Sequence, residues 1–254
     1  MTTASSTSTT SGASAASSLK FQLAADSLNN LTGGANVATW LDTSGQGNHV
    51  SAPGTQPVFQ TNVFGTSPGV RFSSSLMNRT ASLTGFNTTV DSTFFVALSR
   101  TAGSQHHIYN VGSNIGGCNL NRQYMIYAGG TSQFAMEQEG CSGNNSTAFP
   151  TTTNAELHSV MVNATGNVNF YMNGSANGGS IPGWGGFSSP NVLTIGGFPS
   201  SPTGTLAGIV GEILYFNAPL TATSVYGGTT DRVGVECYLS AKYSVALTTG
   251  VACP

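Results

Sequence analysis

The sequence is poor in charge. Its 254 residues include 7 Lys or Arg and 9 Asp or Glu, so charged residues make up 6% of the chain, against about 25% in an average soluble domain. The basic residues are scattered, and this argues against a patch that neutralises the phosphates of a nucleic acid. No apolar run approaches the roughly 20 residues of a membrane-spanning helix. Ser, Thr, Asn, Gln and Gly must therefore supply the polar surface, a composition that suits proteins outside cells or on particles.

Motifs for nucleotide binding and for serine catalysis are missing as well. No phosphate loop or dinucleotide fingerprint occurs, and the many glycines are expected in turns. No Gly-x-Ser-x-Gly elbow precedes a helix, and His158 lies in an apparent core strand. Cysteine and histidine pairs at zinc-ligand spacing are absent, apart from the adjacent His106 and His107. Neighbouring strand residues point to opposite faces, so these two histidines are poor joint ligands.

The first eighteen residues consist almost entirely of Thr, Ser, Ala and Gly. They contain neither the basic nor the apolar region of a secretory signal, and their composition is typical of a flexible tail. We therefore expect a Ser/Thr-rich arm over residues 1–18 and one domain over residues 19–254. If the arm is ordered, a neighbouring subunit is expected to hold it, because it cannot bury enough apolar surface by itself.

Two of the four cysteines are expected to face each other across a hairpin. A glycine pair at positions 129–130 suits a two-residue turn, and opposed residues of this hairpin then have numbers that add up to 259. Cys118 and Cys141 satisfy this sum, and so do Arg122 and Glu137. One register therefore predicts a disulfide and an ion pair, unless a bulge shifts the ladder.

The other two cysteines, Cys237 and Cys253, would tie a C-terminal helix to the last residues. Two disulfides favour an oxidising compartment, or oxidation after assembly into a particle such as a virion. We therefore expect a location outside the cytosol, extracellular or on a virion surface.

Short apolar or alternating runs recur between clusters of Gly, Pro, Ser and Asn. This spacing predicts an all-β protein, an antiparallel sandwich without a second domain. The expected strands are residues 20–24, 69–72, 93–99, 107–111, 123–128, 132–137, 157–163, 167–172, 192–196 and 206–216.

One helix is expected, over residues 230–243. Thr230 is placed to be its N-cap, and Val235, Tyr238, Leu239 and Lys242 lie at helical spacing.

Four segments resemble a known family. They are residues 40–49 (WLDTSGQGNH), 169–174 (NFYMNG), 206–221 (LAGIVGEILYFNAPLT) and 238–243 (YLSAKY). In this order and at these separations they resemble the laminin-G-like branch of the concanavalin A-like lectins and glucanases, over roughly residues 19–245. The resemblance implies a β-sandwich of the jelly-roll type that mostly binds or builds and catalyses only in some branches.

The motif residues have structural explanations. We expect Trp40 to anchor the core, and Asp42 to cap the turn that contains Gly45 and Asn48 by accepting backbone N–H groups.

The remaining motif residues belong to the sheets. Asn173 and Gly174 suit the tight turn of a hairpin. Glu212 should pair with a backbone group or a basic neighbour.

Catalysis is not expected. Catalytic branches of the resembled fold carry their carboxylates in a Glu-x-Asp-x-x-Glu pattern, and retaining hydrolysis needs two carboxyls about 5–5.5 Å apart. Glu137 and Glu139 are the comparable pair, and they would share one face of a strand. The third acid of the pattern is missing, since Gly140 and Cys141 follow. A glycoside hydrolase that uses this pair is thus the weakest of three hypotheses.

The main hypothesis is a non-catalytic structural or surface subunit of an extracellular assembly or virus particle, joined to other subunits through its N-terminal arm. The alternative is a lectin-like, carbohydrate-binding module. Trp184 in a Gly-rich loop and Tyr226 before two glycines are its candidates for stacking on sugar, although a loop tryptophan can also fold back onto the sheet. No cofactor is expected, but a structural calcium ion could accompany such a site. Asp26 with Asp42 is a guess at its ligands.

Overall fold

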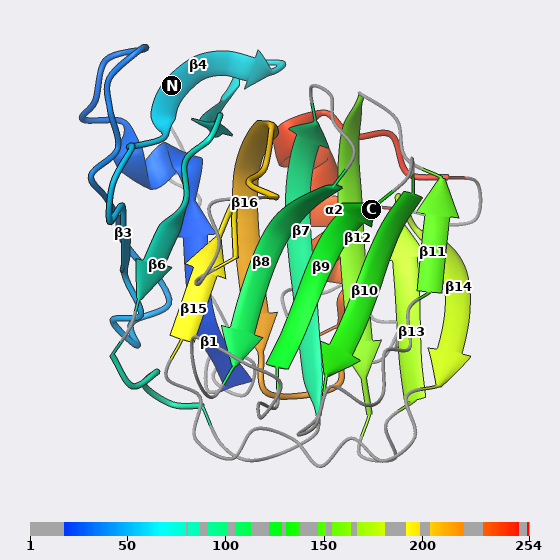
Figure 1. The fold of residues 1–254 in the computed structure, drawn as a ribbon. Helices are drawn as coiled ribbons and strands as arrows, with labels where there is room; N and C mark the ends of the chain where they lie inside the picture. The colour runs from blue at the N-terminus through cyan, green and yellow to red at the C-terminus, as the bar shows by residue number, and fades with distance from the viewer. Residues whose placement is uncertain are drawn as a thin grey trace, which may run out of the picture.

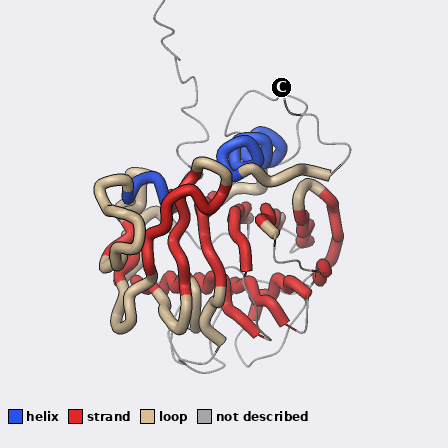
Figure 2. The backbone as a smooth tube through the Cα atoms, turned by 90° about the horizontal axis from the view of Figure 1, so that it is seen from above, coloured by secondary structure: helices blue, strands red, loops and turns tan. Residues whose placement is uncertain are grey.

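Two antiparallel sheets form a β-sandwich, and the α-helix Arg232–Tyr243 lies outside one of them (Figures 1 and 2). The computed structural model describes residues 18–79, 81–86, 91–100, 105–112, 122–128, 131–137, 147–150, 154–163, 167–180, 192–198, 204–220, 231–248 and 253. The all-β sandwich with a short C-terminal helix confirms the expected fold class. Within those ranges, no helix combines the length and the apolarity that a membrane crossing requires.

The first sheet has eight strands, and β16 lies near its centre. Seven strands follow in the order β14-β13-β12-β7-β16-β5-β4, and the eighth, β1, also pairs with β16. Their bounds are β1 Leu19–Ala24, β4 Val58–Phe64, β5 Ser67–Phe72, β7 Ser92–Arg100, β12 Ala155–Val162, β13 Asn167–Met172, β14 Ser175–Ser180 and β16 Gly208–Phe216.

The second sheet also has eight strands, in the order β11-β10-β9-β8-β15-β6-β3-β2. Their bounds are β2 Thr39–Trp40, β3 Val50–Ser51, β6 Met77–Arg79, β8 Gln105–Gly112, β9 Arg122–Ala128, β10 Thr131–Glu137, β11 Thr147–Pro150 and β15 Val192–Ile195. A short 3-10 helix, η1 (Ala25–Leu28), follows β1.

Apolar side chains pack in two layers, because successive strand residues point to opposite faces. Phe94 of β7 faces the space between the sheets, where its ring stacks on Tyr109 of β8 at 3.7 Å. Its neighbour Phe95 faces the other way and belongs to the cluster under helix α2 (Arg232–Tyr243). Both rings are fully buried. The first sheet is thus covered on both faces, and β7 reads as a continuous apolar run.

Helix α2 begins at Arg232, one residue later than a cap at Thr230 would place its start. Asp231 is the N-cap, and its side chain accepts a hydrogen bond from the backbone N–H of Gly234. The assignment of Thr230 to this role was therefore wrong. Asp is at least as good a cap as Thr, and its negative charge suits the positive end of the helix dipole. The helix ends at Ser244, which adopts a left-handed conformation with φ 54°.

The expected hairpin register is present. β9 pairs with β10 through Ala128 opposite Thr131 and Arg122 opposite Glu137, which is the sum of 259. Cys118 and Cys141 lie outside the described residues, so the disulfide between them stays a prediction. The disulfide Cys237–Cys253 is formed and joins α2 to the last residues.

Replacing Cys237 and Cys253 by Ala should lower the free energy of unfolding. The bond closes a loop with a sequence separation of 16, and removing such a constraint from the unfolded chain costs about 3 kcal/mol. Urea unfolding of the double variant and of Cys253→Ala alone measures this. The same loss in both identifies the bond as the cause, whereas unchanged unfolding midpoints would contradict the prediction.

Candidate functional site

A β-bulge in β16 places a carboxylate under the helix. The register of β16 against β7 shifts between Val210 and Glu212, so that Gly211 is the extra residue. Val210 and Ile213 face the core between the sheets, whereas Glu212 contacts α2 on the outer face. A bulge of this kind re-aims the side chains that follow it. If the strand continued from Val210 with regular alternation and no bulge, Glu212 would be the second residue after Val210 and would face the apolar core as Val210 does.

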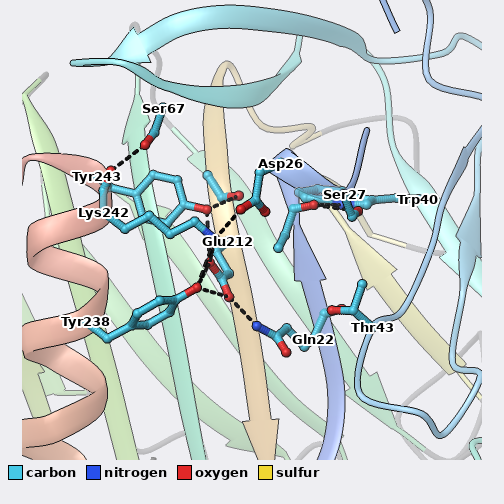
Figure 3. A network of polar contacts seen from close by, with 12 residues as sticks. Gln22, Asp26, Ser27, Trp40, Thr43, Ser67, Glu212, Tyr238, Lys242 and Tyr243 are labelled. Carbon is cyan, nitrogen blue, oxygen red and sulfur yellow. Dashed lines mark hydrogen bonds and ion pairs between the residues drawn. The ribbon is translucent and has the colours of Figure 1, made fainter. Parts of the chain in front are cut away.

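Glu212 is fully buried and has four side-chain partners (Figure 3). Lys242 Nζ donates to Oε2 at 2.8 Å, and the hydroxyl of Tyr238 lies 3.2 Å from the same oxygen. Tyr243 places its hydroxyl 3.0 Å from Oε2, and Gln22 of β1 donates to Oε1 at 2.6 Å. We call Glu212 and these four residues the Glu212 cluster. It confirms the expectation that Glu212 pairs with a basic neighbour.

Gly211 allows the ring of Tyr243 to approach the bulge. A Cβ at this position would lie 2.5 Å from a ring carbon of Tyr243, far inside van der Waals contact. The Tyr243 hydroxyl also lies 3.0 Å from the Gly211 carbonyl oxygen. The glycine therefore serves the contact between strand and helix.

Burial and the charge of Glu212 together shift the pKa values of its neighbours. Burial raises the pKa of Tyr243 and Tyr238, and the Glu212 carboxylate raises both further. For Lys242, burial lowers the pKa, but the charge of the Glu212 carboxylate and the hydrogen bonds that the ammonium group donates to Glu212, Tyr238 and Asp26 raise it by more. Lys242 also bridges to Oδ2 of Asp26 in η1 at 2.9 Å. At neutral pH Lys242, Tyr238 and Tyr243 therefore keep their protons. The Glu212 cluster is a fixed network around an ion pair and does not act as an acid or a base.

A second polar group anchors the first turn of the helix. The Arg232 guanidinium binds the carboxylate of Glu236, and Ser159 of β12 donates to the same carboxylate. The guanidinium also lies 3.7 Å above the ring centre of Tyr171 in β13. Burial raises the pKa of Glu236, although Arg232 and Ser159 oppose the shift. The Arg232–Glu236 pair therefore holds α2 against β12 and β13, whereas Glu212 holds it against β16.

The turn at residues 42–48 has the structure that the sequence predicts. Asp42 Oδ1 accepts the N–H of Ser44 at 2.9 Å, and Oδ2 accepts the N–H of Asn48 at 2.7 Å. Gly45 adopts φ 86°. Trp40 is fully buried, and its indole N–H donates to the carbonyl of Ala24 at 3.0 Å.

Each of the two guessed calcium ligands has other partners. Asp42 uses both carboxylate oxygens within its own turn, and Asp26 pairs with Lys242. Across the described part of the chain, no group of three or more His, Cys, Asp or Glu side chains is arranged to hold a metal ion.

Asn173 and Gly174 close the hairpin between β13 and β14, as expected. Their φ angles are 51° and 84°, a pair of positive values that suits a two-residue hairpin turn. Asn173 also accepts the backbone N–H of Leu157 through Oδ1 at 2.8 Å, so the turn is bonded to β12 as well.

The residues expected to bind sugar, Trp184 and Tyr226, lie outside the described residues, and so does Glu139. For Glu137 the structure describes the backbone pairing alone. His158 is fully buried on β12, with Nε2 3.0 Å from the carboxylate of Glu156, a position in the core rather than beside a nucleophile.

Sequence reasoning missed the partners of Glu212 on the helix and the Arg232–Glu236 pair. A signal for both was available. Arg232 and Glu236, like Tyr238 and Lys242, are four residues apart and therefore share a helix face.

No model of a known protein family matches the chain, and no curated protein matches it. Solved structures do. The serotype D botulinum neurotoxin binding domain superposes with a TM-score of 0.61 at 14% identity, over 90% of this chain and 53% of that one. The botulinum neurotoxin DC binding domain in complex with rat synaptotagmin II gives 0.59 at 14% identity, over 82% and 50%.

A third structure is described as showing that cell entry of botulinum neurotoxin type C depends on interaction with two ganglioside molecules. It gives a TM-score of 0.58 at 16% identity, over 82% of this chain and 50% of that one. The chain thus spans about half the length of these binding domains. At such identities the likeness establishes a shared fold.

The free energy of unfolding should fall as the pH rises above about 10. Lys242, Tyr238 and Tyr243 have raised pKa values in the folded protein, whereas in the unfolded chain Tyr and Lys titrate near 10 to 10.4. The unfolded state therefore loses these protons first, and the stabilisation that is complete below pH 10 is lost as the pH rises. Glu212→Gln should flatten this dependence and should cost about 2 kcal/mol or more at pH 7.

Glu236→Gln is the matched control. It also removes a buried carboxylate at the contact between α2 and the sheet, but this carboxylate lies on α2 and its charged partner is an arginine, which does not titrate in this range. Urea unfolding between pH 7 and 11 should show the wild-type slope in Glu236→Gln and a reduced slope in Glu212→Gln. Equal slopes in the two variants would refute the role of the Glu212 charge.

Proposed function

We propose that this chain is a non-enzymatic, carbohydrate-binding domain that acts outside the cytosol. The observation that carries the proposal is the shared fold over 90% of the chain with a toxin binding domain. One such toxin binding domain is described in complex with SialylT. For another, the cell entry of the toxin is described as dependent on interaction with two ganglioside molecules. The laminin-G-like resemblance of the sequence points in the same direction. The neutral, hydroxyl-rich composition suits recognition of sugars through hydrogen bonds.

Five of the described carboxylates have structural roles, which supports a function without catalysis. Glu212 and Glu236 hold the helix, and Asp42 holds a turn. Asp231 caps α2, and Glu156 contacts His158. Retaining hydrolysis would need two carboxyls about 5–5.5 Å apart that are free to act as nucleophile and acid. These side chains instead have structural partners.

Trp184 and Tyr226 remain the residues that we propose to stack on the sugar. Trp184→Ala should weaken glycan binding about tenfold or more, as truncation of a central aromatic anchor does. Trp184→Phe keeps a flat apolar face and should lose less. A glycan array followed by calorimetry on the best ligand measures the effect, together with the melting temperature.

Leu41→Ala is the control for that experiment, since Leu41 is an apolar side chain that is 49% exposed. It should bind as the wild type does. If each Trp184 variant unfolds, the residue belongs to the core and the proposed site is wrong.

A role as a structural or surface subunit of an extracellular assembly or virus particle is the second proposal. The low charge and the Ser/Thr-rich residues 1–18 support it. The two roles are compatible, because a surface subunit can also bind glycans.

Deleting residues 1–17 should impair assembly and leave folding intact. Ser18 is kept, because its carbonyl accepts the backbone N–H of Asn217 at 2.8 Å. Sedimentation compares the truncated chain with one in which the same residues are shuffled. Unchanged assembly after deletion would rule out the arm as the point of attachment, and a matching loss in the shuffled chain would show that its sequence matters.

A further inference from the structure

A polar hollow lies on the outer face of the first sheet, on β4 and β5 and the loop that follows β5. Its volume is about 220 Å³, and it is lined by Gln56, Val58, Gln60, Arg71, Ser73 and Ser75. The lining contains one cation, two amides, two hydroxyls and one aliphatic side chain. This mixture can hydrogen-bond a polar, uncharged ring and can bind one negative charge beside it.

The side chain of Arg71 has no partner among the described residues. It is exposed, and within the described ranges it makes no ion pair and no hydrogen bond. Other arginines are engaged: Arg79 donates to the carbonyls of Gly47 and Ser82 at 3.0 and 3.2 Å, and Arg232 binds Glu236. The guanidinium fork of Arg71 is therefore available to a ligand. Such a fork matches a carboxylate or sulfate, which it can bind with two parallel hydrogen bonds.

The strand that carries Arg71 is held on both sides. Arg71 lies opposite Val58 of β4 and opposite Ile209 of β16. Next to it on the same strand face, Gly69 is packed so closely that a Cβ would lie 2.4 Å from Ile209. The backbone under the hollow is thus fixed before any ligand arrives, which reduces the entropy lost on binding.

The loop at the end of β5 is also shaped by specific contacts. Ser74 adopts a left-handed φ of 52°, and the backbone N–H of Ser73 donates to Ser75 Oγ at 3.2 Å. Ser75 is 3% exposed. The two serines that line the hollow are therefore placed by the loop itself.

A second hollow of about 280 Å³ also has Ser75 in its lining, together with Thr55, Ser74 and Thr205 among others. Nothing lies within 4 Å of a Cβ built at Gly54, another lining residue. Each hollow is somewhat smaller than the usual range of small-ligand sites, about 300–1,000 Å³, so each suits a single sugar ring.

We propose that these hollows form a second carbohydrate site, which selects an acidic sugar by pairing its carboxylate or sulfate group with Arg71. The amides and hydroxyls around Arg71 bind the sugar hydroxyls. Arg71 is the one cation in the lining of the first hollow, and the chain has a net charge of −2. These charges suit a ligand with one isolated negative charge rather than a polyanion. The sugar part of this inference rests on the proposed function, but the site is separate from Trp184.

The test uses NMR titration of the full chain with methyl glucuronide, methyl glucoside, methyl glucoside 6-sulfate, acetate and sulfate. The glucuronide or the 6-sulfate should bind about tenfold or more tightly than the glucoside. Arg71→Met should abolish this preference, and Arg71→Lys should retain part of it, because it keeps the charge and loses the fork. Lys20→Gln removes the same charge from β1 and should leave the preference unchanged. The two acidic sugars distinguish carboxylate from sulfate, and the free ions distinguish the sugar from its charge.

Three results would overturn the proposal. They are equal binding of acidic and neutral sugars, an acidic preference that survives in Arg71→Met, and acetate or sulfate binding as tightly as the acidic sugars. If glycan binding depends on Trp184 and not on Arg71, the second site is wrong while the proposed function stands. If no glycan binds to the wild type, both fail. If Arg71→Met loses the acidic sugars and Trp184→Ala does not, the second site is supported by itself.

Discussion

A buried carboxylate must be paired, and the pairing of Glu212 organises the outer side of this molecule. Transferring an unpaired charge from water into the protein interior costs far more free energy than the hydrogen bonds of a β-ladder contribute. The chain meets this constraint with Lys242 and two tyrosines from α2 and with Gln22 from β1. The bulge at Gly211 turns the carboxylate toward them. The position of the helix, the conformation of the central strand and the docking of the N-terminal strand are therefore three consequences of one buried charge.

Scarcity of charge and its placement belong together. Lys242 bridges Glu212 and Asp26, and Arg232 serves Glu236, so charged side chains fasten the helix to the sheet. The surface is left to amides and hydroxyls, which bind neutral groups and are insensitive to salt. Against this background the guanidinium of Arg71, which has no partner among the described residues, is conspicuous. In a chain of average composition, the same side chain would be one of many solvated cations.

The sequence predicts much of the fold because strand alternation is strong where apolar residues dominate. β7 and the β9–β10 hairpin are examples, and the register of the hairpin follows from its glycine pair. β14 (Ser175–Ser180) was missed because it has no apolar period, and it forms by pairing with β13 through the Asn173 turn. The bulge at Gly211 is invisible to a period of two residues. The site is less predictable than the fold. Most partners of Glu212 lie on α2, and no local sequence pattern shows where this helix packs on the sheet.

The pairing of β1 with β16 has a consequence for how the chain folds during synthesis. Gln22 and Glu212 are 190 residues apart, so the first strand leaves the ribosome long before the strand that it needs. β16 also separates β5 from β7, and until it arrives these earlier strands have open edges. Such long-range pairing slows folding and exposes unpaired strands to association with other chains. A nascent chain of this protein therefore carries incomplete sheet edges until β16 has been made.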